Sequence, residues 1–177
     1  MSDSRRFEIF PYREEDIITR PGGRFPILRP TVDVRLARDD LSAVVSVLID
    51  TGAPFSLFAR GVGDALDLDW DRADARRADH TIGGGQHVAQ LEQLQLTLPP
   101  FEGLSWETEV GFFVDDWQMP FAGVLGHQGF LDRWAVSFNY SQNYFVVEEP
   151  GVFHGRLPPD YDEVYQSRDL GWKGGAT

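Results

Sequence analysis

Residues 47–53 read VLIDTGA, and the fold of the chain is inferred outward from this stretch. It completes the apolar run of residues 41–49, whose β-branched side chains predict a strand buried on both faces. A carboxylate, Asp50, follows directly at the end of that strand. By its spacing alone, Asp50 is either an ordinary turn or capping residue, or a partly desolvated carboxyl suited to acid–base chemistry. Thr51 adds a hydroxyl beside it, and Gly52 permits close approach of the backbone.

The surrounding segments also predict short strands. Residues 32–36 alternate apolar and polar side chains, and with residues 41–49 they form a hairpin that turns at Asp39-Asp40. Further strands are expected at residues 90–98, 110–114, 121–126, 135–138 and 144–147. Short helical segments fit residues 57–68 and 128–134. Many short strands, little helix and no βαβ rhythm predict an all-β barrel or sandwich.

Two glycine-containing segments stand out beside the Asp50 stretch. Residues 81–88 read TIGGGQHV, which predicts the tip of a hairpin; taken alone, this is an ordinary flexible turn. Residues 123–126 read GVLG within an apolar strand. After residue 149 the chain becomes rich in glycine and proline, which predicts an arm packed on the domain or a tail.

In their order along the chain, these segments resemble the retroviral-type (retropepsin-like) family of single-domain aspartic proteases. Residues 48–53, LIDTGA, are similar to the family's catalytic signature, and residues 81–88 are similar to its flap hairpin. Residues 123–126, followed by Phe130-Leu131 and by residues 136–140, resemble its second conserved block. The resemblance covers residues 32–147. Gln128 departs from the Asp or Asn common there, and Gly129 is an extra residue that bacterial members tolerate.

The resemblance implies a fold and a set of site residues. The fold is an all-β, closed acid-protease barrel over residues 1–149, with one short helix near the C-terminal block and residues 150–177 as an extension or arm. The implied site residues are the catalytic Asp50, its supporting loop Thr51, Gly52 and Ala53, the flap Ile82, Gly83, Gly84 and Gly85, and the second block Val124, Leu125 and Gly126. Of these, Ala53, Ile82 and Val124 are expected to line apolar subsites.

The implied reaction is hydrolysis of a peptide bond by water, with two carboxylates that share one proton. The chain has a single Asp-Thr-Gly and no Asp-Ser-Gly, so a pair requires Asp50 from a second chain, in a homodimer with a two-fold axis at the site. Across that axis, the family pattern has the Thr51 hydroxyl bond to the partner's backbone. The expected substrate is an extended, mostly apolar peptide, and no metal or organic cofactor is implied. The alternative is a catalytically silent domain of the same fold that binds peptides or dimerises.

Composition narrows the possible partners and location. Asp and Glu number 28 against 16 Lys and Arg, a net charge of −12, which argues against binding to nucleic acid or to anionic lipid. The absence of cysteine excludes disulfides, thiolate metal sites and cysteine nucleophiles. The four histidines lack zinc-helix spacing, and no phosphate-binding loop is present. Apolar runs are too short for a membrane helix, and residues 1–8 do not resemble a secretory signal, so a cytoplasmic location is expected.

Overall fold

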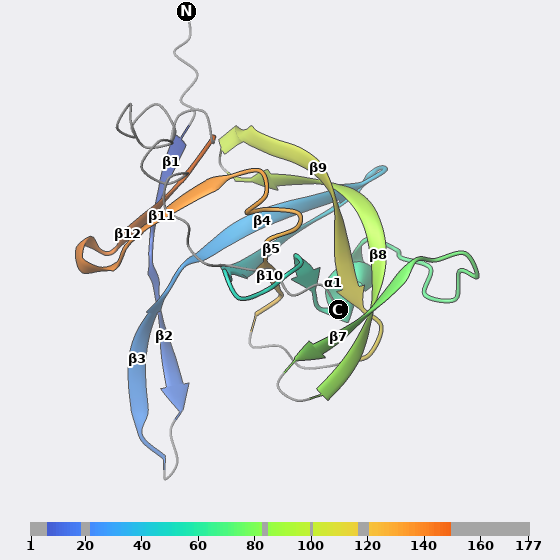
Figure 1. The fold of residues 1–177 in the computed structure, drawn as a ribbon, viewed down its shortest axis with the longest axis horizontal. Helices are drawn as coiled ribbons and strands as arrows, with labels where there is room; N and C mark the ends of the chain where they lie inside the picture. Colours follow the sequence, from blue (N-terminus) through green and yellow to red (C-terminus); the bar gives the residue numbers. More distant parts are fainter. Residues whose placement is uncertain (1–6, 19–21, 83–84, 100, 117–120, 150–177) are drawn as a thin grey trace, which may run out of the picture.

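The computed structural model describes residues 7–18, 22–82, 85–99, 101–116 and 121–149 (Figure 1). Its strands are β1 (Phe7–Pro11), β2 (Arg13–Ile18), β3 (Arg24–Arg29), β4 (Thr31–Arg38), β5 (Leu41–Ile49), β6 (Leu57–Phe58), β7 (Arg77–Ile82), β8 (Gly85–Leu98), β9 (Phe101–Phe113), β10 (Gly123–Leu125), β11 (Ala135–Asn139) and β12 (Tyr144–Glu148). They are joined by one α-helix, α1 (Arg60–Ala65), and one 3-10 turn, η1 (Tyr140–Gln142), within the described residues. The predicted all-β class is confirmed. The proposed extension, residues 150–177, lies outside the described residues.

The pairings of the largest sheet run in a ring. They pass from β4 to β5, β10, β6, β9 and β8, and β8 returns to β4 through Arg35–Ala37. The neighbours β5–β10 and β6–β9 are parallel, whereas β4–β5 and β8–β9 are antiparallel hairpins. Strand β7 pairs with β8 outside the ring. The ring places β10, which carries the GVLG segment, directly beside the end of β5 that leads to Asp50.

Alternating side chains of the ring strands build the core. Val32, Val34 and Leu36 of β4 are fully buried, as the period of two predicted. Other buried apolar residues of this core come from β5, β6, β8, β9, β10 and the segment after β10: Val47, Ile49, Phe58, Leu94, Leu96, Leu98, Trp106, Val110, Phe112, Leu125 and Phe130. Burial of this apolar surface is the main favourable contribution to folding.

The prediction that residues 41–49 are buried on both faces was wrong. Val47 and Ile49 are buried, but Leu41 is 43% exposed and Val44 is 58% exposed. The reason is that only one face of β5 packs on the core. Ala43, Val45, Val47 and Ile49 lie on that face, whereas Val44 lies on the opposite face. The β-branched residues at the start of β5 therefore favour the strand conformation without being buried.

Of the two predicted helical segments, the one at residues 57–68 is confirmed by α1, whereas the one expected near the C-terminal block was wrong. Residues 127–133 form successive turns, with bonds such as Leu131 N–H to Gly126 O (3.0 Å) and Trp134 N–H to Phe130 O (3.0 Å). Gly129 has a φ of +95°, a left-handed conformation that an α-helix cannot contain. The extra glycine thus interrupts the helix expected at residues 128–134.

Two smaller sheets flank the ring. The order β1-β12-β11 joins the first and last described strands, and Phe10 stacks on Phe145 within it, with 5.5 Å between ring centroids. Strands β2 and β3 form a separate hairpin that extends away from the ring (Figure 1). Its base is tied to β4 by an ion pair between Arg13 and Asp33 (2.8 Å). Among the described residues, no helix has the length and apolar character needed to span a membrane.

Candidate active site

Asp50 occupies the first position after β5, where the neighbouring strand β10 fixes its backbone. The Asp50 N–H donates to the Leu125 carbonyl over 3.0 Å, which extends the parallel pairing of Val124 with Leu48 and Leu125 with Ile49. Two segments far apart in the sequence therefore meet at this carboxylate. The structure brings together the predicted catalytic residue and the predicted second block.

Residues 50–55, called the Asp50 loop from here on, orient the carboxylate through backbone hydrogen bonds. Gly52 N–H donates to Asp50 Oδ1 over 2.8 Å, and Ala53 N–H donates to the Asp50 carbonyl over 3.2 Å. A side-chain oxygen that accepts from the backbone two residues later forms a tight local turn. Asp50 itself is half-buried, and Thr51 and Gly52 are exposed. The carboxyl group is thus fixed by the backbone and still reaches solvent.

Gly126 lies where no other residue fits. A Cβ at this position would lie 2.3 Å from the Phe55 carbonyl oxygen and 2.6 Å from that of Ala53, closer than real contacts allow. The glycine lets residues 126–128 run against the Asp50 loop. His127 N–H donates to the Ala53 carbonyl (2.8 Å), and Gln128 N–H donates to the Pro54 carbonyl (2.9 Å). The GVLG segment therefore holds the Asp50 loop by main-chain bonds.

Two side chains that the sequence did not single out as loop supports complete this arrangement. Buried Ser56 accepts a hydrogen bond from Gly126 N–H at its Oγ, over 3.1 Å. The side chain of His127 bonds to the Thr51 carbonyl through Nε2, over 2.8 Å. Because a carbonyl oxygen only accepts, the imidazole must carry its proton on Nε2. In the sequence, the position of His127 directly after Gly126 was the one feature that could have indicated its role in the loop. Nothing in the sequence around Ser56 indicates its role.

Gln128 departs from the family pattern, and other bonds anchor its segment. Gln128 contributes its carbonyl, which accepts from Ser56 N–H (2.9 Å), and it forms a bridge with Phe55. The Asp132 carboxylate accepts from Gly129 N–H over 3.1 Å. Residue 128 has no carboxylate to accept a hydrogen bond from this turn. Asp132 supplies one instead.

The β7–β8 hairpin corresponds to the predicted flap. Ile82 pairs with Gly85, and Gly83 and Gly84 of the predicted tip lie outside the described residues. Two residue pairs from the Ile82–Gly85 end of the hairpin, the His80 ring meets the Phe55 ring edge-on, with 5.4 Å between centroids. Phe55 and Val124 pack in turn on a small cluster of Leu57, Ala89 and Phe113. The hairpin therefore contacts the Asp50 loop through aromatic side chains.

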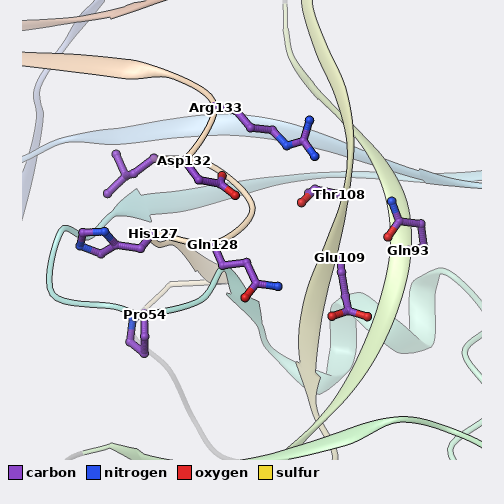
Figure 2. A pocket seen from close by; sticks show the side chains of 9 residues that line it. Pro54, Gln93, Thr108, Glu109, His127, Gln128, Asp132 and Arg133 are labelled. Atoms are coloured by element: carbon purple, nitrogen blue, oxygen red, sulfur yellow. The ribbon is translucent and has the colours of Figure 1, made fainter. Parts of the chain in front are cut away.

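A cavity of about 650 Å³ opens beside this loop (Figure 2). One wall is Pro54, His127 and Gln128, and the opposite wall comes from β8 and β9 with Gln93, Thr108 and Glu109. Leu131, Asp132 and Arg133 close a third side. Its lining is predominantly polar, and it does not include Asp50 or the residues expected to form apolar subsites, Ala53, Ile82 and Val124. Among the described residues, no three histidine or acidic side chains gather in a way that could hold a metal ion.

Comparisons with known proteins place this geometry in a fold. No family model matches the chain, and no curated protein matches it. The structure is similar to that of a retropepsin-like aspartic protease from Rickettsia conorii, with a TM-score of 0.50 and 14% identity, over 81% of this chain and 93% of that one. It also matches EIAV protease complexed with the inhibitor HBY-793, with a TM-score of 0.39 and 22% identity, over 56% of this chain and 82% of that one. The chain has a retropepsin-like fold.

Proposed function

We propose that the chain is an aspartic endopeptidase whose active site forms from Asp50 of two chains. The observation that carries the proposal is the fixed position of Asp50: Leu125 O holds its backbone, and Gly52 N–H holds Oδ1. A carboxylate at a strand end in a retropepsin-like fold, half-buried and backbone-oriented, has the rigidity that acid–base catalysis needs. Thr51, Gly52 and Ala53 support it, and Val124, Leu125 and Gly126 hold the loop.

The reaction uses two carboxyl groups and one water. The ionised Asp50 takes a proton from water while the water oxygen bonds to the peptide carbonyl carbon, and the protonated Asp50 of the partner gives its proton to the carbonyl oxygen. The tetrahedral intermediate then collapses: the first Asp50 returns its proton to the amide nitrogen, the C–N bond breaks, and the second regains its proton from the hydroxyl. Two adjacent carboxylates retain one proton because both cannot ionise at close range.

Dimerisation follows from the count of catalytic motifs. One chain supplies one Asp-Thr-Gly, and the pair of carboxyl groups requires two. A two-fold axis through the site would bring the same loop from each chain face to face. The substrate is an extended peptide beneath the β7–β8 hairpin, with Ala53, Ile82 and Val124 as its apolar contacts.

The test is Asp50→Asn, with Asp40→Asn as a matched control. Both changes remove one carboxylate and keep its shape, but Asp40 lies exposed in the turn between β4 and β5. We expect Asp50→Asn to abolish cleavage of an apolar peptide library, a loss of at least about a hundredfold, because acid–base catalysis typically contributes that much. Asp40→Asn is expected to cleave like the unmodified chain.

Cleavage that persists in purified Asp50→Asn would exclude this mechanism. If the unmodified chain binds peptides but does not cleave them, and Asp50→Asn binds equally well, the alternative of a silent peptide-binding domain replaces the proposal. Thermal unfolding of both variants serves as the check that each is folded.

A further inference from the structure

Strand β7 lies at one end of the largest sheet. Among the described strands it pairs only with β8, from Arg77 opposite Gln90 to Ile82 opposite Gly85. An outer strand is hydrogen-bonded along one edge, so its separation from the sheet breaks only that one set of backbone bonds. Its side-chain contacts therefore contribute strongly to holding it in place. His80 of β7 contacts the Asp50 loop at Phe55.

His80 is packed as an apolar side chain would be. It is 8% exposed, its ring lies edge-on against Phe55, and its buried Nε2 has no hydrogen-bond partner among the described residues. A buried nitrogen without a partner costs free energy, and a charged imidazole there costs more. The packed position therefore suits the neutral form of His80.

The histidine directly opposite has different surroundings. His87 on β8 pairs with His80 in register, so both side chains lie on the same face of the hairpin. His87 packs against Phe113 (5.7 Å between centroids), and its Nδ1 lies 3.0 Å from Asp115 Oδ2. His87 thus has a carboxylate beside it, whereas a protonated His80 faces the uncharged ring of Phe55.

The charges around His80 are few. On its own strand Asp79 is the neighbouring charge, and successive strand residues point to opposite faces. From β8 the facing titratable group is His87, whose partner is Asp115, and the Asp50 loop contributes the neutral Phe55. Burial lowers the pKa of His80, and Asp79 offsets part of that effect.

We propose that protonation of His80 releases β7 from the Asp50 loop, while β8 stays paired with β9. The packed state favours neutral His80 and the released state has an ordinary histidine, so packing is strongest above pH ~6.5. It weakens as the pH falls below that value towards the lowered pKa of packed His80. Within this range, each pH unit shifts the balance towards release by up to about tenfold.

If the chain is the proposed protease, acid loosens the strand β7 that contacts the catalytic loop, and this consequence rests on the proposed function. The movement itself is independent of catalysis and is measured without it. The chosen readout is amide hydrogen exchange, corrected for the intrinsic effect of pH, in the full chain and in Asp50→Asn. Residues 77–82 report on β7, and residues 31–38 of β4 serve as the internal reference.

Between about pH 7.5 and about pH 5, we expect protection of residues 77–82 to fall at least several-fold more than protection of residues 31–38, in both proteins. His80→Phe keeps an aromatic ring against Phe55 and removes the titration, so its β7 protection should not change with pH. His87→Gln, the matched change on the opposite strand, should keep the pH response because His80 still titrates.

Equal protection of β7 at both pH values in the unmodified chain would overturn the inference, as would a full response in His80→Phe. If His80→Phe does not fold, the NMR titration of the His80 ring in the unmodified chain decides: a pKa below ~6.5 supports the inference, and one at or above ~6.5 overturns it. If β7 responds to pH but the chain cleaves no peptide, the proposed function fails and the inference stands.

Discussion

At the scale of single residues, Asp50 is positioned by its neighbours' main chain. Leu125 O, Gly52 N–H and the close passage of Gly126 all act through backbone atoms. At Leu125, Gly52 and Gly126, the space available to a side chain therefore matters more than its chemical groups. Gly126 is the clearest case, because carbonyl oxygens of Ala53 and Phe55 occupy the space a Cβ would need.

Gly126→Ala should therefore destabilise the fold. The added methyl meets rigid backbone, so the loop or β10 must move, at a cost of about 1–3 kcal/mol or more in the free energy of unfolding. Gly61→Ala is the matched control, since a Cβ at Gly61 meets nothing within 4 Å and the residue lies in α1. Alanine favours helix over glycine by roughly 1 kcal/mol, so this variant should be as stable as the unmodified chain or more so.

Chemical denaturation of both variants measures the difference. Equal midpoints for Gly126→Ala and the unmodified chain would show that residues 126–128 are not packed against the Asp50 loop as described.

At the scale of elements, the apolar pattern predicted where the strands lie better than it predicted which of their residues are buried. Strands at β4, β5, β8, β10, β11 and β12 follow the sequence prediction within a few residues. The Asp50 loop and the GVLG segment were predicted as one site from their motifs, and the structure places them side by side. The sequence did not show whether other elements cover the second face of a strand, as the exposed Val44 of β5 illustrates.

Three elements show where the sequence prediction ended. The first part of β9 was missed, although Leu104, Trp106 and Thr108 alternate there and are buried. Strand β1 offers no clean alternation, because Phe7 and Ile9 are exposed and Phe10 is buried. The third is the helix expected at residues 128–134, which the positive φ of Gly129 prevents. Long-range packing and a local left-handed residue settled these elements, not their own periodicity.

Strand β5 provides a test of its one-sided burial. Val47 is fully buried and Val44 is 58% exposed on the same strand. Val47→Thr places a hydroxyl in the core at nearly constant shape and should cost about 1–3 kcal/mol of unfolding free energy. Val44→Thr should change stability by less than about 0.5 kcal/mol. Thermal or urea unfolding of the pair checks this, and equal losses would mean that both faces of β5 are covered in solution.

At the scale of the whole molecule, charge bears on assembly. Each chain carries −12, so a dimer carries twice that, −24. Like charges repel at long range, and salt screens them, with a Debye length of about 10 Å at 0.1 M. The proposed dimer should therefore tighten as ionic strength rises from low values, and its activity per chain should fall on dilution below the dimer Kd.

Sedimentation across protein and salt concentration, run alongside peptide cleavage, follows both effects. A chain that stays monomeric at every concentration while retaining full activity would rule out a site shared between two chains.

Subunit mixing tests most directly whether two copies of Asp50 form one catalytic site. The unmodified chain is equilibrated with a ninefold excess of Asp50→Asn, and cleavage is compared with that in an equal mass of an inert protein. If chains exchange freely, about nine in ten unmodified chains pair with a variant, so activity per unmodified chain should fall to about a tenth. Activity per unmodified chain that stays constant at all ratios, under conditions where exchange is shown to occur, would mean that each chain carries a complete catalytic site of its own.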